Sequence, residues 1–503
     1  LFKSKLNYWS KQGVPGPPAS LLRLGNLIEY ETSDSTRLEL DWAQKYGQVY
    51  GVYFGTEAIL TVTDPELVKQ ILVKDFHIFV DRRNLNTMHE LVNNGQFFAQ
   101  GSSWKRIRTI TGPTFTSARL RKMLPLMNKC VEQLKEYLNR QIQENGGVIQ
   151  AREVCTGFAI DVISSTVFAT TTNANSSHGK ENAVITSGMN LFDSPYLRII
   201  SFLIFPRWFN NITGIRYPFN KDSFEYLSSM VREIIRQQKL NGAKGNRHDF
   251  VQLLMDTFVD ESELADGGFE KLTAQIDLPD DSTKNNQQKK VINKATLSVD
   301  EIIAQCLVFF VAGFETTSAS ITHCLFELAS NQSIQQKLKD EVQETLADLD
   351  ANSDLYYSTI MTKMPYLDAV VHETLRKYPP IKRIERKLTG ADEYRIGGAL
   401  LKRGMMVNIP TLAIHHSESF YSDPHLFIPE RFLPENKDKL VPYTYLPFGA
   451  GPRIGMRFAY QEIKLCIAKM IGEFNFQTTP KTPVKLEFKK FKPTLNVKPF
   501  ELK

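Results

Sequence analysis

One stretch near the middle of the chain places an acid and two hydroxyl groups inside an otherwise apolar run. The segment AGFETTS puts Glu315, Thr316 and Thr317 in a single helical turn, two positions after the Ala312-Gly313 pair. A carboxylate beside a hydroxyl suits proton delivery to a bound oxygen species, and the small Ala-Gly pair would let a flat ligand approach the backbone. The alternative is a solvated surface turn, but the apolar residues on both sides argue against it. We therefore predict Glu315 and Thr316 as catalytic residues.

Three arginines elsewhere stand where they could bind carboxylates. Trp104 and Arg108 are four residues apart, which puts an indole N–H and a guanidinium on one helix face. Glu373 and Arg376 can pair at a spacing of three residues, and Arg431 in DPHLFIPERFLPEN could bind the same carboxylate. Ordinary exposed helix surface is the alternative for either pair alone. The set predicts a structural staple around Glu373 and an anion site at Trp104 and Arg108.

A glycine-rich loop, LPFGAGPRIG, runs directly into a helix-forming segment. Its glycine spacing is not the dinucleotide-binding fingerprint, and it has no Gly-Lys-Ser/Thr of a phosphate-binding Walker loop. What remains is a loop against a helix N-terminus, with Arg453 available for an anion.

Hydrophobic periodicity predicts the elements that must position these groups. Alternating residues predict two strands within YGQVYGVYFGTEAILTVT, followed by a helix that Asp64 caps and Pro65 begins. A long apolar helix carries AGFETTS, and Pro379-Pro380 ends the helical runs. Further helices are predicted over Lys122–Glu144, Arg152–Ala169 and Phe219–Leu240, an exposed loop over Leu278–Ser298, and short strands over Ile381–Thr411. The fold class is α+β and mostly α-helical, with a small sheet near the start and around residue 400.

Composition narrows the class of protein further. The 503 residues are 42% hydrophobic with 32 phenylalanines, which is globular and indicates a large apolar interior or pocket. The net charge of +6 is spread along the chain, without the basic block of a nucleic-acid tail. The five cysteines have no CxxC spacing, which fits reduced thiols facing the cytosol rather than a zinc site or a disulfide frame.

Two segments have a possible relation to lipid. The basic start with Tyr8 and Trp9, followed by VPGPP, is either a disordered beginning or a juxtamembrane linker with a stiff Pro-rich hinge, and we favour the linker over residues 1–18. Residues 19–503 would form a single catalytic domain. Ser194–Ile215 is aromatic and carries two arginines, so it is either buried core or a segment that dips into the membrane interface.

Taken in order, these motifs resemble a cytochrome P450. The Pro-rich hinge, Trp-x-x-x-Arg, AGFETT, ETLR, PERF and the glycine loop follow one another over about 440 residues. Details such as HETLRKYPP and GMRFAYQEIK resemble the microsomal clan that contains the insect detoxification P450s and the main human drug-metabolising P450s.

The resemblance implies a role for each matched residue. The propionates of a haem b would be bound by Trp104, Arg108, Arg386 and Arg453. Phe448 of the glycine loop and Ala312 and Gly313 of the long helix would flank the haem. Glu315 and Thr316 would manage proton delivery, and Glu373, Arg376 and Arg431 would form the structural triad. The substrate pocket and its entrance would be shaped by Phe97, Phe98, Phe309, Phe310, Phe314, Ile381 and the segment Ser194–Ile215.

The sequence departs from the family at one point. The family's loop reads Phe-Gly-x-Gly-x-Arg-x-Cys-x-Gly, and its cysteine is the axial thiolate of the haem iron. Here two residues are lacking between Arg453 and Ile454, including that cysteine, and Cys466 lies about 18 Å further along the helix. No metal ligand is therefore present at this position in the sequence.

Three functions follow from the resemblance. The first is a haem-thiolate monooxygenase of the endoplasmic reticulum membrane, on its cytosolic face. It would oxidise lipophilic xenobiotics or lipids with O2 and electrons that NADPH supplies through NADPH-cytochrome P450 reductase, with cytochrome b5 as an optional second partner. The second is a catalytically inactive protein of the same fold that binds haem or apolar ligands. The third, a peroxide-using isomerase or dehydratase, is disfavoured by the intact Glu315-Thr316 pair.

Overall fold

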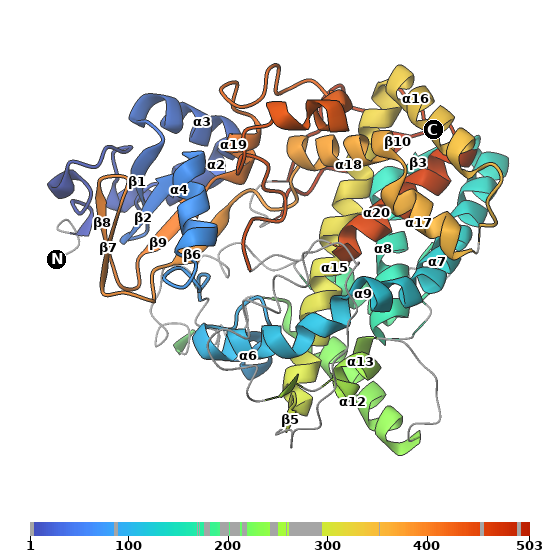
Figure 1. Ribbon diagram of the computed structural model, residues 1–503, viewed down its shortest axis with the longest axis horizontal. Helices are drawn as coiled ribbons and strands as arrows, with labels where there is room; N and C mark the ends of the chain where they lie inside the picture. Colours follow the sequence, from blue (N-terminus) through green and yellow to red (C-terminus); the bar gives the residue numbers. More distant parts are fainter. Residues whose placement is uncertain are drawn as a thin grey trace.

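The protein is described from a computed structural model in which a strand-rich part lies beside a larger helical part (Figure 1). The described residues are 5–84, 89–168, 170, 172–175, 182–191, 201, 212–213, 219–241, 250–257, 259–260, 294–351, 353–452, 457–489 and 494–503. The helices are α2 Leu27–Thr32, α3 Ser35–Tyr46, α4 Pro65–Lys69, α5 Glu90–Asn94, α6 Gly101–Thr111, α7 Ser117–Asn145, α8 Ala151–Phe168, α9 Ala183–Asn190, α12 Lys221–Asn241, α13 Phe250–Asp256, α15 Val299–Ser330, α16 Gln332–Leu346, α17 Asp354–Thr362, α18 Pro365–Lys377, α19 Thr411–His415 and α20 Arg457–Glu473. The strands are β1 Val49–Phe54, β2 Glu57–Val62, β3 Ile149–Gln150, β4 Val259–Asp260, β5 Lys294–Ala295, β6 Ile384–Lys387, β7 Glu393–Ile396, β8 Ala399–Lys402, β9 Met406–Ile409 and β10 Glu501–Leu502.

The main sheet joins two distant parts of the chain. Its order is β1-β2-β9-β6, with β1 antiparallel to β2, β2 parallel to β9, and β9 antiparallel to β6. The alternating pattern before Asp64 therefore forms a hairpin, as predicted, and the strands after Pro380 complete the same sheet. Ile59 pairs with Met406 across the parallel contact. Figure 1 shows this sheet apart from the long helices, with β6 directed toward them.

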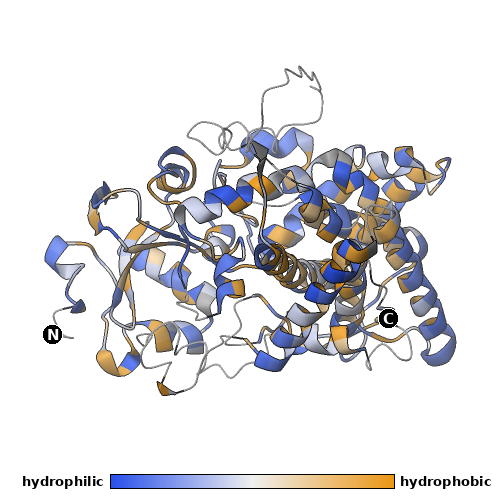
Figure 2. Ribbon diagram, turned by 90° about the horizontal axis from the view of Figure 1, so that it is seen from below, coloured by the Kyte–Doolittle hydropathy of each residue, from blue (hydrophilic) through white to orange (hydrophobic). Residues whose placement is uncertain are grey.

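Helix α15 is the central element of the helical part. It begins with a capping box, in which the Ser298 hydroxyl accepts from the Glu301 N–H and the Glu301 carboxylate accepts from the Ser298 N–H. Helix α8 packs along it, and a Cβ on Gly313 would come within 2.6 Å of Ile163 in α8. Figure 2 shows hydrophobic residues on the helices in the middle of the molecule and hydrophilic residues on its outer helices. The absence of a side chain at Gly313 therefore allows α8 to lie close to α15.

Most predicted helices and strands are confirmed. Asp64 caps α4 by accepting from the Leu67 N–H at 2.9 Å, and the predicted long helix ends at Ser330. The helices predicted from Lys122, Arg152 and Phe219 correspond to α7, α8 and α12. Of the predicted loop Leu278–Ser298 only residues 294–298 are described, and there Lys294–Ala295 forms strand β5, paired with β4, instead of loop. The segment Ser194–Ile215 lies almost entirely outside the described residues.

The N-terminal segment lies against the sheet. Trp9 is 2% exposed and donates its indole N–H to the Val52 carbonyl at 3.2 Å. Gly51 makes room for it, because a Cβ there would come within 2.2 Å of the indole ring. Among the described residues, only α15 is long and apolar enough to cross a membrane, and 61% of its most apolar window is buried inside the protein.

Candidate haem and substrate site

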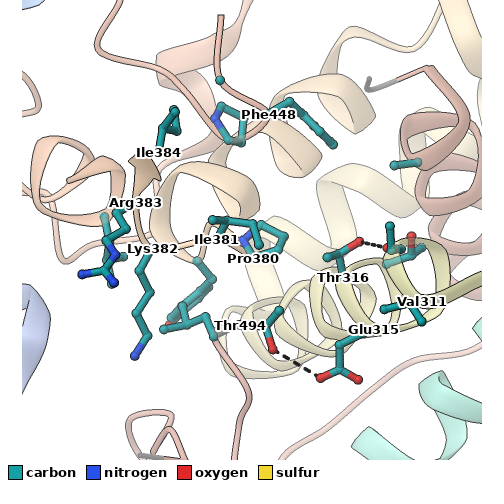
Figure 3. Close-up of a pocket in the computed structure, with 18 of the residues that line it drawn as sticks. Val311, Glu315, Thr316, Pro380, Ile381, Lys382, Arg383, Ile384, Phe448 and Thr494 are labelled. Carbon is teal, nitrogen blue, oxygen red and sulfur yellow. Dashed lines mark hydrogen bonds between the residues drawn. The ribbon is translucent and has the colours of Figure 1, made fainter. Parts of the chain in front are cut away.

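A cavity of about 1800 Å³ lies between α15, the sheet-side segment after Pro380 and a loop near the C-terminus that contains Thr494 and Leu495. We call this segment the C-terminal loop. Figure 3 shows Thr316 and Glu315 on α15, with Ile381 and Thr494 beside them and Phe448 above. The predicted site residues that line the cavity are Phe97, Phe98, Arg108, Phe309, Ala312, Gly313, Glu315, Thr316, Ile381, Arg386 and Phe448. The structure therefore brings together residues that are up to 351 positions apart in the sequence, from Phe97 to Phe448.

The hydroxyl and the acid on α15 have different surroundings. Thr316 donates its hydroxyl to the Ala312 carbonyl at 2.6 Å, the bond to the preceding turn that such threonines make. The Glu315 carboxylate lies 3.2 Å from the Arg152 guanidinium of α8 and accepts from the Asn496 amide at 2.6 Å. Thr494 donates to the same oxygen at 3.4 Å. Both residues border the cavity, and Glu315 is in addition held by α8 and the C-terminal loop.

Three neighbouring arginines also line the cavity: Arg108 and Arg386 are buried, and Arg82 is half-buried. Arg386 is 1% exposed, and burial followed by repulsion from Arg82 lowers its pKa well below the usual arginine range. Burial and the neighbouring Arg108 lower the pKa of Arg82 in the same direction. Both shifts mean that positive charge here is desolvated and repelled by positive charge. An anionic ligand in the cavity would relieve this repulsion.

Arg82 is a site residue that the sequence did not reveal. It lines the cavity, and its guanidinium lies 4.4 Å from the centre of the Phe97 ring. Its backbone is held on both sides: the Lys387 N–H donates to the Asp81 carbonyl at 2.7 Å, and the Gln100 side chain donates to the Arg82 carbonyl at 3.2 Å. The pair of arginines in FVDRRN was the only available signal, and it does not show which arginine faces inward.

The predicted staple around Glu373 is present. Arg376 donates to both Glu373 oxygens, at 2.7 and 2.8 Å, and to the His415 and Leu426 carbonyls at 2.9 and 3.2 Å. The Arg431 guanidinium lies 3.5 Å from Glu373. Glu373 and Arg376 are fully buried, so the cluster joins α18 to the loop that carries Arg431.

His415 extends this cluster to the glycine loop. Its Nε2 accepts from the Leu446 N–H at 2.8 Å, so its Nδ1–H donates to the Arg376 carbonyl at 2.9 Å. Burial lowers the pKa of His415 to about 3, so the ring is neutral near pH 7. The loop before Phe448 is therefore fixed to the same arginine that binds Glu373.

Three of the predicted residues do not line the cavity. Phe310 and Phe314 are at most 1% exposed and pack in the core, because their positions on α15 are turned away from that of Phe309. Phe310 stacks on Phe168 of α8 with ring centres 5.5 Å apart. Trp104 is 1% exposed and packs against Phe76, behind the cavity wall. Arg453 lies outside the described residues.

A buried acid near the glycine loop was also missed. Glu462 of α20 is 1% exposed, and burial raises its pKa well above the usual range, with only partial opposition from the Thr317 hydroxyl. Burial therefore favours the neutral, protonated form of this acid. In the sequence it is an ordinary acid in an amphipathic helix, so its pattern carries no signal of burial.

The cysteines lie away from the cavity. All five are buried, and none of them lines it among the described residues. Burial raises the pKa of Cys466 well above its usual range, which keeps that thiol protonated. Within the described part of the chain, no group of three or more His, Cys, Asp or Glu residues is placed to hold a metal ion.

Comparison with known proteins decides the family. The cytochrome P450 family model matches residues 15–503. The chain is a member of the cytochrome P450 family. It is 33% identical over 491 residues to cytochrome P450 3A11 of Mus musculus, covering 96% of this chain and 89% of the relative. It is 32% identical to cytochrome P450 3A5 of Homo sapiens, covering 95% of this chain and 88% of the relative.

Membership of this P450 family confirms the predicted fold and activity. P450 enzymes are haem-thiolate monooxygenases that receive electrons indirectly and act on lipophilic compounds including xenobiotics, and the comparisons give no support to the inactive alternative. The residues present fit the cofactor at its acidic edge, because buried, mutually repelling arginines suit two carboxylates. The family's axial cysteine has no counterpart in this sequence, and Arg453 to Met456 are outside the described residues.

Proposed function

We propose that this P450 binds haem b in the 1800 Å³ cavity and oxidises lipophilic small molecules with electrons from NADPH-cytochrome P450 reductase, with cytochrome b5 as a second donor. One oxygen atom of O2 would enter the substrate, and the other would leave as water with two protons and two electrons. The observation that carries the proposal is the cavity itself. Its wall combines an apolar aromatic surface, a Thr-Glu pair on α15 and neighbouring arginines whose charges repel one another.

The propionate groups would be held by Arg82, Arg108 and Arg386, with Arg453 of the glycine loop as a fourth cation and Trp104 supporting Arg108 from behind. Phe448 would cover the haem on the loop side. Ala312 would leave room for it on the α15 side, while the missing side chain of Gly313 makes room for Ile163 of α8. Haem supplies the iron at which O2 is activated.

The protein's own residues would control the protons. Thr316 Oγ1 can exchange its bond to the Ala312 carbonyl for a bond to a polar group in the cavity. Once its carboxylate is released from Arg152 or Asn496, Glu315 would take up a proton from water and pass it to that hydroxyl. The apolar wall, including Phe97, would exclude bulk water and favour lipophilic ligands.

Residues 1–18 would form the juxtamembrane segment, and residues 19–503 the catalytic domain, at the cytosolic face of the endoplasmic reticulum membrane. The close relatives named above and the basic, aromatic start of the chain support this location. Glu373, Arg376 and Arg431 would hold the loop in register rather than take part in the chemistry.

The test is the absorption spectrum of the purified, reduced, carbon-monoxide-bound protein, together with its haem content. A strongly red-shifted Soret band means that a thiolate binds the iron, and the monooxygenase proposal then stands. A band typical of histidine or neutral ligation, or no haem, overturns it and leaves a protein with a P450 fold only.

A further inference from the structure

A fully buried glutamine on α15 holds one wall of the cavity in place. Gln305 is 0% exposed, and its side-chain amide donates to the Asn94 carbonyl at 2.7 Å and to the Glu301 carbonyl at 3.1 Å. Its oxygen accepts from the Gln96 N–H at 2.7 Å. One side chain therefore fixes the backbone on both sides of Gly95.

The segment held by Gln305 has no room to shift inward. A Cβ on Gly95 would come within 2.5 Å of Val308 on α15, so the backbone already lies directly on the helix. From the other side, the Thr111 hydroxyl of α6 donates to the Gln96 side chain at 2.7 Å. The segment is thus held between α15 and α6.

The next residues form the aromatic wall. Phe97 and Phe98 line the cavity with their rings 5.0 Å apart in an edge-to-face arrangement. Phe98 also lies 6.5 Å from the Phe219 ring, and Phe97 lies under Arg82. The position of both rings follows from the backbone at residues 94–96, because Phe97 directly follows Gln96 and Phe98 comes one residue later.

We propose that Gln305 is a specificity-positioning residue, which sets the width of the cavity by fixing the Phe97–Phe98 wall. The ligands that it selects are flat aromatic molecules, whose faces and edges fit such a ring pair. This inference rests on the proposed function, in which the cavity is the substrate site. Gln305 itself does not line the cavity, so it acts through the two phenylalanines.

A second glutamine provides a matched control. Gln335 of α16 is 2% exposed; its amide donates to the Phe476 and Leu328 carbonyls at 2.8 and 3.0 Å, and its oxygen accepts from the Phe476 N–H at 2.7 Å. Like Gln305, it therefore makes two bonds to the backbone of a loop-side segment and one bond to a carbonyl of α15. Neither Gln335 nor Phe476 lines the cavity. A merely structural effect should be equal at the two sites.

The experiment compares haem-loaded wild type, Q305L and Q335L by equilibrium dialysis with naphthalene and pyrene. The quantity measured is the ratio of the two dissociation constants. Q305L should change this ratio about tenfold, because a misfit of about one methylene has that effect in an apolar pocket. Q335L should leave the ratio unchanged while lowering the melting temperature by a similar amount.

A second pair of variants with smaller changes allows the test even if the leucine variants do not fold. Q305E keeps the acceptor for the Gln96 N–H and loses the donor to Asn94, so it should change the ratio less than Q305L, and Q335E should not change it. Equal ratios in Q305L, Q305E and wild type would overturn the inference, as would the same shift in Q335L. If the wild type binds neither probe, the cavity is not a site for aromatic ligands, and the inference falls together with the proposed substrate site.

Discussion

Two buried arginine clusters in this protein have opposite electrostatic character. Arg376 is fully buried with four hydrogen bonds, two of them to the Glu373 carboxylate. Arg386 is equally buried, but its neighbour is another cation, Arg82, and its Nε has no hydrogen-bond partner within the described residues. The first cluster is complete without a ligand. In the second cluster the arginine charges repel one another, and an anion in the cavity would relieve that repulsion. This difference is what we expect between a structural cluster and a binding site.

The largest expected effect is on the complete cluster. R376L would leave the Glu373 carboxylate buried without its main partner, which should lower the free energy of unfolding by about 3–5 kcal/mol. Denaturant unfolding followed by circular dichroism measures this change. The double variant E373L/R376L removes both charges and should recover part of the loss. A loss below about 1 kcal/mol in R376L would mean that the cluster does not carry this role.

Removing Arg386 from the second cluster should have different effects on stability and on haem affinity. R386L removes a desolvated and repelled cation, so the unfolding free energy of the haem-free protein should stay within about 1 kcal/mol or rise. Haem affinity should fall about tenfold or more, because a charge-assisted hydrogen bond is lost. Thermal unfolding and haem titration measure the two quantities.

The control for R386L is Arg83, which binds Glu385 at 3.0 and 3.1 Å in the same region. R83L should destabilise the haem-free protein, because it leaves Glu385 without this partner. If R386L destabilises it to the same extent, the contrast between paired and repelled arginines is wrong.

A third test, with a smaller expected effect, uses Glu462. This buried acid has no cation beside it among the described residues. Its raised pKa means that the folded protein holds a proton that the unfolded chain releases. The free energy of unfolding of the wild type should therefore fall as pH rises above the usual glutamate value. Between about pH 5 and pH 7 the stability of E462Q relative to wild type should increase by about 1–2 kcal/mol. Parallel pH profiles for the two proteins would contradict a protonated Glu462.

The sequence predicted what depends on local pattern. The capped helix at Asp64, the β1–β2 hairpin and the Glu373–Arg376 pair follow from spacing within one element. The partners of Glu315 could not be predicted, because Arg152 and Asn496 come from distant segments that only the packing of α8 and the C-terminal loop brings together.

Helical phase explains a second limit. The cluster of phenylalanines on α15 was treated as one surface, but consecutive helical positions differ by about 100°. Phe309 therefore reaches the cavity, while Phe310 and Phe314 enter the core beside α8. The position of Arg82 depends in part on the backbone bridge between Asp81 and Lys387. No local sequence pattern predicts a bridge between such distant residues.

The parallel contact between β2 and β9 has a consequence for how the chain is made. Ile59 of β2 cannot pair with Met406 of β9 until most of the protein has been synthesised. The edge of the β1–β2 hairpin at β2 therefore stays unpaired during most of synthesis. Contacts between such distant residues form slowly, and an open apolar edge is prone to association with other chains. The N-terminal hairpin is therefore the part of this P450 for which chaperone protection during synthesis matters most.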